Sequence, residues 1–327
     1  MSQYLVTGVE APEAESTSGS DENSDYGSYA ESSYTATSSI FEYQYENGRR
    51  YHAFRAGQYL LPNDDDEQER LDMTHHVFRL ALDGELCATK LDDPMRILDV
   101  GTGTGLWAVE MGDLFPKTEI VGTDLSPIQP SWVPPNVSFY VEDATGEWSF
   151  APDDFDFIHA RTLAGSILDW PSFLQRCMFH LRPGGKLEIA EGRANFWYAR
   201  NSVPSDSYTH QWLSEWRRLS SMLHFDVFPE LSGFAEKCSF KNVKTKEVVV
   251  PLGLWPKDPK LKEIGRWFKA QFLESALEAY TLALFTRNGG WKEVEVKTLI
   301  AHVKEEIEQG RMQLYTFCSF LTAEKPK

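Results

Sequence analysis

The chain has 327 residues, of which 42% are hydrophobic, 13% aromatic and 25% charged, which predicts a globular protein of one large domain or two small ones. Its net charge of −17 argues against direct nucleic-acid binding, and no apolar run is long enough to span a membrane. The N-terminus lacks the basic and then apolar pattern of a secretory signal, so we expect a cytoplasmic protein that is not secreted.

The cysteines and histidines argue against a metal site. The four cysteines lie at least 61 residues apart and form no CxxC pair, and the eight histidines form no HxxxH pair. Widely spaced thiols in a chain without a signal are typical of a reducing compartment. We therefore expect no bound metal and no disulfide framework.

Residues 1–40 form an acidic, Ser-rich segment. Residues 1–48 hold nine Asp or Glu and no Lys or Arg, which accounts for about half of the charge imbalance. Such a composition buries too little apolar surface to offset the entropy of ordering, so we expect a disordered tail. A phosphorylatable docking tail is a compatible interpretation, because many of its serines lie near acidic residues.

Residues 41–93 are expected to form an N-terminal helical lid segment. Aromatic residues and arginines enter together here, and the acidic run at 64–66 favours a helix start. Tyr51 and Arg55 are candidates for lid contacts with a cofactor or substrate. The other interpretation is a helix packed on the sheet, with its arginines paired to surface acids.

From Pro94 onward, short apolar strands alternate with helices. This alternation predicts a parallel sheet covered on both faces. Asp169 caps the second helix, and Pro183-Gly184-Gly185 is expected to turn into the fifth strand. The predicted strands are 96–100, 119–124, 137–142, 155–159 and 186–190, and the helices are 106–115 and a segment that begins at Trp170.

The second half is more helical. We expect a domain over 94–327 with a helical insertion at about 200–240 and no internal repeat. The predicted helices are 208–223, 261–285 and one around 296–307, and the predicted strands are 241–250 and 314–321.

The most informative motif joins the first of these strands to its helix. Asp99 ends an apolar strand, and Gly101, Gly103 and Gly105 follow at alternate positions, with Thr102 between the first two. A dinucleotide fingerprint would need glycine at 106, where the chain has leucine, and the pyrophosphate loop GxxxxGK[ST] is absent. An acid followed by GxGxG is the pattern of class I S-adenosylmethionine methyltransferases.

Two further acids end the next two strands. Asp124, followed by Leu125, is placed to accept both ribose hydroxyls, and Asp143, followed by Ala144, to accept from the adenine amino group. Asp99 is expected to contact the ammonium group directly or through water. These acids and the glycine loop predict S-adenosylmethionine as the cofactor. Of the substitutions considered at this site, Gly105→Ala is expected to disturb binding least, because it adds one methyl group at a helix start.

The sequence resembles the fungal LaeA-like methyltransferases over roughly residues 40–320. The resemblance extends beyond the glycine motif to the stretches at 47–64, 69–76, 124–130, 155–161 and 255–258 and to Gly290-Trp291. It implies a class I, Rossmann-like α/β fold with a mostly parallel seven-stranded sheet, an antiparallel last strand and helices on both faces. It also implies S-adenosylmethionine as cofactor and, usually, a role in secondary metabolism.

The catalytic residues are less well defined by the sequence. His159 is the leading candidate, either for lining the cofactor pocket or for acting as a base, while His75, His76 and Glu191 are weaker ones. Trp197, Trp212 and Trp216 are either substrate-pocket or core residues. A hydroxyl acceptor needs a base and a carboxylate does not, so the pattern leaves the acceptor atom open.

Three functions are therefore considered. The first is a tailoring methyltransferase that acts on a small-molecule metabolite. The second, implied by the resemblance, is a regulator of secondary metabolism that works through protein partners, which makes the nucleus the alternative location. The third is a Rossmann-like oxidoreductase or a SAM fold without catalysis.

Overall fold

The structure, a computed structural model, describes residues 43–52, 60–199, 203–221 and 223–327. Its described part is built around an eight-stranded sheet in the order β5-β4-β3-β6-β7-β10-β8, with β9 also paired to β10. The strands are β3 (Arg96–Val100), β4 (Glu119–Asp124), β5 (Val137–Val141), β6 (Phe155–Arg161), β7 (Leu181–Gly192), β8 (Trp197–Tyr198), β9 (Lys241–Pro251) and β10 (Leu314–Glu324).

The strand directions confirm the predicted sheet. β3 to β7 pair in parallel, whereas β10 runs antiparallel to β7 and β9. Seven of the strands form the expected arrangement, and the two-residue β8 is an addition on β10. Because neighbouring strands are parallel, the carboxyl ends of β3, β4, β5 and β6 meet at one edge of the sheet, where ligands bind in open α/β folds.

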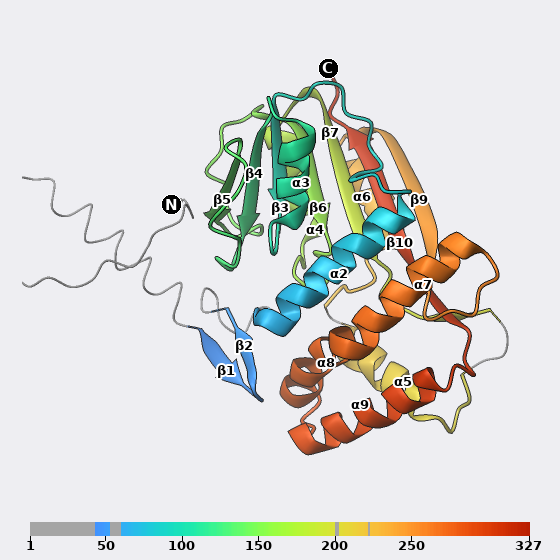
Figure 1. The fold of residues 1–327 in the computed structure, drawn as a ribbon. Coiled ribbons are helices and arrows are strands. Elements are labelled where there is room, and N and C mark those ends of the chain that lie inside the picture. The colour runs from blue at the N-terminus through green and yellow to red at the C-terminus, as the bar shows by residue number, and fades with distance from the viewer. Residues whose placement is uncertain (1–42, 53–59, 200–202, 222) are drawn as a thin grey trace, which may run out of the picture.

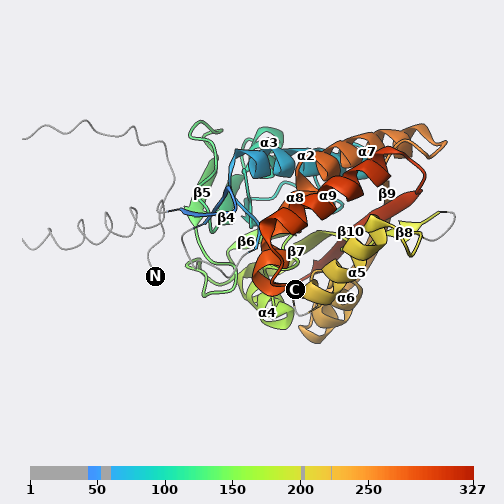
Figure 2. The same ribbon diagram turned by 90° about the horizontal axis from the view of Figure 1, so that it is seen from below.

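Helices cover both faces of the sheet (Figures 1 and 2). One layer contains α2 (Asp65–Ala81), α3 (Leu106–Leu114) and α7 (Pro259–Gln271), and the other contains α4 (Trp170–His180) and α6 (Phe228–Lys237). Asp169 caps α4 as predicted, by accepting a hydrogen bond from Ser172 N, and α2 begins in the acidic run expected to favour a helix start, where Asp64 caps it by accepting from Glu67 N.

A second group of helices extends past the sheet, at the lower right of Figure 1. It comprises α5 (Tyr208–Ser220), α8 (Leu277–Ala279), α9 (Glu293–Glu308) and the π-helical turns Phe272–Ala276 and Leu284–Asn288. These elements share a core of their own, distinct from the core beneath α4. The predicted insertion at about 200–240 therefore divides, because α5 joins this helical group while α6 packs on the sheet.

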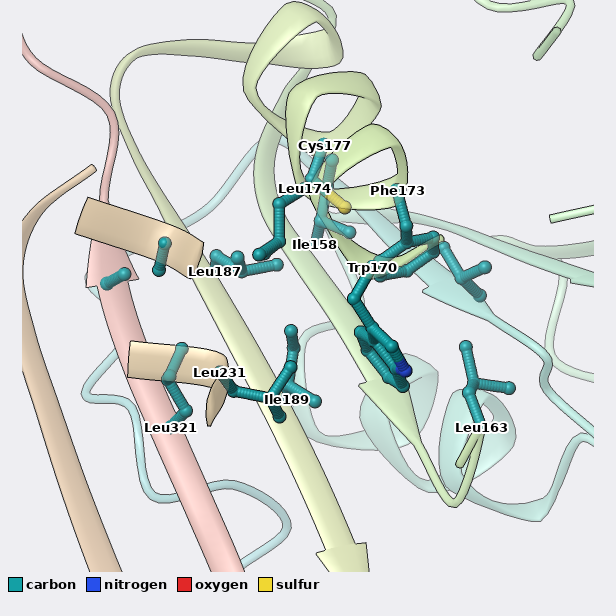
Figure 3. Close-up of a cluster of buried hydrophobic side chains, with 14 of the residues drawn as sticks. Ile158, Leu163, Trp170, Phe173, Leu174, Cys177, Leu187, Ile189, Leu231 and Leu321 are labelled. Atoms are coloured by element: carbon teal, nitrogen blue, oxygen red, sulfur yellow. The ribbon is translucent and has the colours of Figure 1, made fainter. Parts of the chain in front are cut away.

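The core beneath α4 fixes the strands that carry the site (Figure 3). Trp170, Phe173 and Leu174 point from α4 toward Ile158 and Ile189 on the sheet, and all five are buried. Burying a large apolar side chain contributes about 1.5–3 kcal/mol relative to exposure. This packing holds the ends of β6 and β7 in place for the residues that follow them.

Three predicted elements differ from the structure. Residues 44–51 form a hairpin of β1 (Gln44–Glu46) and β2 (Arg49–Tyr51) rather than part of a helical lid, so the helical part of that segment is α2. The helix predicted over 261–285 is interrupted by π-helical turns and by a turn at Tyr280, where the Thr281 hydroxyl bonds back to Leu277 O. The expected turn at 183–185 is instead a register shift within β7.

Two predictions fall on residues outside the described ones. They are the disorder of residues 1–40 and the lid contact of Arg55. Within the described ranges, the four cysteines are free thiols, and no set of three or more His, Cys, Asp or Glu side chains is placed to hold a metal ion. No helix in that part of the chain could cross a membrane.

Candidate active site

A turn of three left-handed glycines leads from β3 into α3. Gly101, Gly103 and Gly105 have φ angles of +68°, +59° and +79°, which residues with a Cβ rarely adopt. A Cβ on Gly101 would lie 2.3 Å from Leu163 Cδ2, and one on Gly105 would lie 2.5 Å from Phe139 Cζ. The Phe139 ring fills the space beside Gly105, so even one added methyl group there should cost stability, while the expectation that Gly105→Ala disturbs cofactor binding least stays a prediction.

Asp99, on β3, supports the glycine turn by a bond to Thr102. It is 3% exposed, and its two oxygens bond the Thr102 hydroxyl at 2.6 Å and His159 Nδ1 at 2.7 Å. The His159 ring is 1% exposed and stacks on Trp107, with ring centroids 3.8 Å apart. The structure thus corrects the expected place of His159, which lies beneath the glycine turn in contact with Asp99 rather than in the wall of a cavity.

Asp124 closes the turn from the neighbouring strand. Its carboxylate accepts hydrogen bonds from Gly103 N and Ser126 N, both at 2.9 Å. Burial and, to a smaller extent, the nearby Asp99 carboxylate raise the pKa of Asp124 to about 6, against the lowering effect of the backbone donors. The Gln129 amide donates to Gly103 O at 2.7 Å and so ties the chain after β4 to the same turn.

These groups border a cleft at the carboxyl ends of the strands, called here the strand-end cleft, with about 970 Å³ of empty space. Gly101, Gly103, Asp124, Leu125, Asp143 and Ala144 line it, as the sequence predicted. Asp143 also accepts from Thr145 N at 2.8 Å. Of the other predicted cofactor-binding residues, Asp99, Thr102, Gly105 and His159 lie behind this lining rather than in it.

The N-terminal segment supplies a wall of the strand-end cleft that the site prediction missed. Pro62, Asn63, Glu67 and Leu71 line it, and the Asn63 amide donates to the Ser126 hydroxyl at 3.2 Å. The family resemblance at 47–64 and 69–76 includes Pro62, Asn63 and Leu71, whereas Glu67 lies between the two stretches and had no such signal. Tyr51, the predicted lid residue, is buried elsewhere, with the Arg287 guanidinium 4.7 Å above its ring.

Arg161 and the paired histidines of α2 lie between the sheet and α2. Arg161, at the end of β6, lines the strand-end cleft and lies 3.1 Å from His75 Nδ1. Burial and the cationic Arg161 and Arg79 lower the pKa of His75 to about 2, so its ring is neutral near pH 7. His76 instead packs edge-on against Trp267. Neither histidine lines the strand-end cleft.

A second hollow, called here the aromatic cavity, adjoins the strand-end cleft and contains about 1040 Å³ of empty space. Aromatic rings make up much of its wall, including Phe78, Phe196, Trp212, Trp216, Phe272 and Tyr280. Trp212 and Trp216 are therefore both core and cavity residues, whereas Trp197 packs against Phe317. Among the described residues, Thr162 alone lines both spaces, and its φ of +55° is unusual for a β-branched residue.

Helix α2 forms another part of the division between the two spaces. Glu67 lines the strand-end cleft and Arg70 lines the aromatic cavity. Their buried side chains form a two-point ion pair with N–O distances of 2.7 and 2.8 Å. Breaking a buried pair by removing one partner typically costs about 3–5 kcal/mol, so this pair holds the wall rigidly.

Glu191 lies at the border of the two spaces. It is 2% exposed, lines the aromatic cavity, and its Oε1 accepts from Leu163 N at 2.8 Å and Ala164 N at 3.2 Å. Burial raises the pKa of Glu191 to about 8, although the two backbone donors lower it. Glu191 is therefore the one weaker candidate from the sequence that the structure places at a described cavity with its carboxyl group strongly perturbed.

The strand-end cleft fits S-adenosylmethionine better than a nucleotide with phosphates. Its described lining includes four carboxylates, of Glu67, Asp124, Glu142 and Asp143, and one cation, of Arg161. Carboxylates accept from hydroxyl, amino and ammonium groups and repel a pyrophosphate. The apolar side chains of Leu125, Ile128, Leu163 and Ile167 are suited to a flat base. The fold and this cleft define a class I methyltransferase that uses S-adenosylmethionine.

Comparisons with known proteins agree. Residues 73–245 match the methyltransferase domain family. Methyltransferase pytC of Aspergillus terreus is 40% identical, over 89% of this chain and 90% of its own. The secondary metabolism regulator LAE1 of Cochliobolus heterostrophus is 34% identical, over 86% of this chain and 94% of its own. The protein-methionine methyltransferase laeA of Emericella nidulans is 32% identical, over 90% of this chain and 79% of its own. The chain belongs to the LaeA-like family of methyltransferases.

Solved structures give a more distant likeness. The phosphoethanolamine N-methyltransferase 2 of Haemonchus contortus, solved with S-adenosyl-L-methionine, covers 93% of this chain and 75% of its own, with 15% identity and a TM-score of 0.47.

Proposed function

We propose that this protein is a tailoring enzyme of fungal secondary metabolism, which transfers the methyl group of S-adenosylmethionine to a small molecule bound in the aromatic cavity. The observation that carries the proposal is the contact between the two spaces at Thr162. One space suits the methyl donor, and the other is lined mainly by apolar and aromatic side chains, several of which are buried. Ligand pockets for small molecules are lined in this way, mostly by apolar and aromatic side chains with a few polar groups.

The cofactor-binding roles follow the cleft geometry. We assign the ribose hydroxyls to Asp124, the adenine amino group to Asp143 and the close backbone approach to Gly101 and Gly103. Asp99 and Thr102 hold the glycine turn, and the His159–Asp99 bond fixes Asp99 in turn. When bound, S-adenosylmethionine supplies an electrophilic methyl group. The protein then has to align an acceptor with that group, and such positioning contributes much of the acceleration in displacement reactions.

A regulatory function through protein partners is the second candidate. It is favoured by the relatives of 31–35% identity that are named secondary metabolism regulators. The aromatic cavity favours the tailoring function, because a concave aromatic wall matches a small apolar acceptor better than a protein surface. Neither candidate involves nucleic-acid binding or a membrane.

Comparative metabolite profiling of a deletion strain tests the proposal. The strain is complemented with the wild-type gene or with Asp124→Ala. For a tailoring enzyme, deletion replaces one product by a congener lighter by one CH₂, and the wild-type gene alone restores the product. A collapse of many unrelated products would contradict tailoring and favour regulation. Unchanged profiles would contradict both.

A further inference from the structure

We propose that Glu191 is the proton acceptor for a neutral hydroxyl group of a flat, mostly apolar acceptor held in the aromatic cavity. This inference rests on the proposed methyltransferase function and adds to it the acceptor class and a catalytic residue.

The first support is the position of the carboxyl group. Glu191 Oε1 is anchored to Leu163 N and Ala164 N, just after β6. Leu163 lines the strand-end cleft, Ala164 lines the aromatic cavity, and Thr162 beside them lines both. The anchor points of the carboxyl group therefore lie on the strip of chain that separates donor from acceptor. Within the described residues, Oε2 has no hydrogen-bond partner, so it is available to a ligand.

A second support comes from comparison with another buried acid on the same strand. Glu188 is 0% exposed, accepts from Ala88 N, Thr89 N and the Thr89 hydroxyl, and lines neither cavity. Because Glu188 borders no cavity and three donors of the chain use its oxygens, its role is structural. Glu191 has one oxygen occupied and its residue borders a cavity, which is the arrangement that a ligand-binding carboxyl group requires.

Charged and titratable groups around this border do not neutralise Glu191. Arg70 is paired to Glu67, and Arg193 to Asp226 and Glu247. The groups that line the two spaces here are Glu67 and Arg70 on α2, Arg161 at the end of β6, Arg193 after β7, Arg217 on α5, Tyr280 after α8 and Cys318 on β10. Burial is therefore the main cause of the raised pKa of Glu191. A pKa of about 8 makes this carboxyl group a proton acceptor suited to neutral or mildly alkaline pH.

The cavity wall indicates the acceptor class. The rings of Phe196, Trp212 and Phe272 lie within 6.2 Å of one another, centroid to centroid, and offer apolar faces to a flat molecule. A carboxylate acceptor would be ionised already, would need no proton acceptor, and would be repelled by the carboxylate form of Glu191. A neutral hydroxyl would instead donate a hydrogen bond to it.

The transfer balances without another reactant. The acceptor oxygen forms a bond to the methyl carbon with one of its lone pairs, while the carbon–sulfur bond breaks and its electron pair stays on sulfur. The hydroxyl proton passes to the Glu191 carboxylate, which later releases it to solvent. The products are a methyl ether and S-adenosylhomocysteine.

The test uses 2-naphthol as a flat hydroxyl probe and 2-methoxynaphthalene as its matched ether. Binding of each to the full chain saturated with S-adenosylhomocysteine is followed by tryptophan fluorescence. We expect the preference for 2-naphthol to rise roughly tenfold as the pH is raised from about 6 to about 9, because the carboxylate form of Glu191 accepts a stronger hydrogen bond. Glu191→Gln should lose this pH-dependent preference, whereas Glu188→Gln should keep it.

Methyl transfer to 2-naphthol gives a second readout. Glu191→Gln should lower kcat/KM about a hundredfold near neutral pH, and the deficit should shrink at high pH, where the hydroxyl ionises unaided. Equal naphthol preference in wild type and Glu191→Gln, or wild-type protein that does not methylate 2-naphthol, would overturn this inference. Neither result would contradict the methyltransferase function, which fails only if the profiling above shows no change or the chain does not bind S-adenosylhomocysteine.

Discussion

The strand-end cleft and the aromatic cavity are built in different ways. Most of the cleft lining comes from short stretches that directly follow consecutive strands, and the backbone N–H of Gly103 in the glycine turn donates to Asp124. The cavity is assembled from side chains far apart in the chain, as the bonds Trp212–Thr281 and Gln271–Thr74 illustrate. The cofactor site is therefore fixed by local sequence and the acceptor site by tertiary packing, so the second can change while the first stays the same.

Gly103→Val should have the largest effect, confined to the cleft. The position has a φ of +59°, and even a Cβ there lies 3.3 Å from Leu71 Cδ1, so valine brings backbone strain and fills the cleft. Titration calorimetry with S-adenosylhomocysteine should show no binding. Tight binding by this variant would contradict the placement of the cofactor against the glycine turn.

Trp212→Ala should damage the cavity and leave the cleft competent. The side chain is buried and its indole N–H donates to Thr281 Oγ1 at 2.9 Å. Truncating such a residue costs about 3–5 kcal/mol in unfolding free energy, whereas Trp212→Phe loses mainly one hydrogen bond, about 1 kcal/mol. Urea denaturation measures both losses. The folded fraction of each variant should bind S-adenosylhomocysteine like wild type, and weaker binding would show that the two regions are not independent.

Gly105→Ala should lower stability through crowding against Phe139. A left-handed alanine costs about 1–2 kcal/mol, and overpacking adds about 1–3 kcal/mol. Gly84→Ala is the matched control, because Gly84 has a φ of +94° and open space around its Cα. The excess loss of Gly105→Ala over Gly84→Ala in urea denaturation isolates the crowding. Equal losses would mean that Phe139 moves aside at no cost.

Asp124→Ala should weaken the binding of S-adenosylhomocysteine roughly ten- to a hundredfold. Hydrogen bonds to a charged acceptor contribute about 1.5–3 kcal/mol each, less where water competes. The melting temperature should change less than in Gly105→Ala, because the Gly103 and Ser126 N–H groups that lose their acceptor border the cleft, where water can replace it. Wild-type affinity in this variant would refute the assignment of the ribose to Asp124.

The smallest effect concerns pH. Because the pKa of Asp124 in the free protein is about 6, lowering the pH through that value neutralises the acceptor and should weaken S-adenosylhomocysteine binding severalfold. The sign for folding is opposite, since a raised pKa stabilises the fold at low pH and this contribution is lost as the pH rises through about 6. Asp124→Asn should show neither dependence, and a pH-independent wild-type affinity would contradict the role of the charged form.

The sequence was sufficient to predict those regions whose structure depends on residues close together in the chain. Local patterns predicted the strand at 96–100, the helix start at 64–66, the cap Asp169, and the cleft residues Gly103, Asp124 and Asp143. It was insufficient where contacts between residues far apart in the chain decide how a side chain is oriented. His159 was expected at the end of a strand as a cofactor-binding residue, but it lies within β6 and its ring turns to Asp99 and Trp107. Likewise, the role of Glu191 depends on its contact with the loop after β6, and a sequence pattern alone does not show that this loop lies next to Glu191.

A crystal structure of the chain with S-adenosylhomocysteine tests the central claim, that the two spaces form one active site. We predict the ribose on Asp124, the adenine beside Asp143 and the sulfur directed toward Thr162, with the aromatic cavity open in front of it. A sulfur atom directed away from Thr162, or a ligand bound outside the strand-end cleft, would contradict the account.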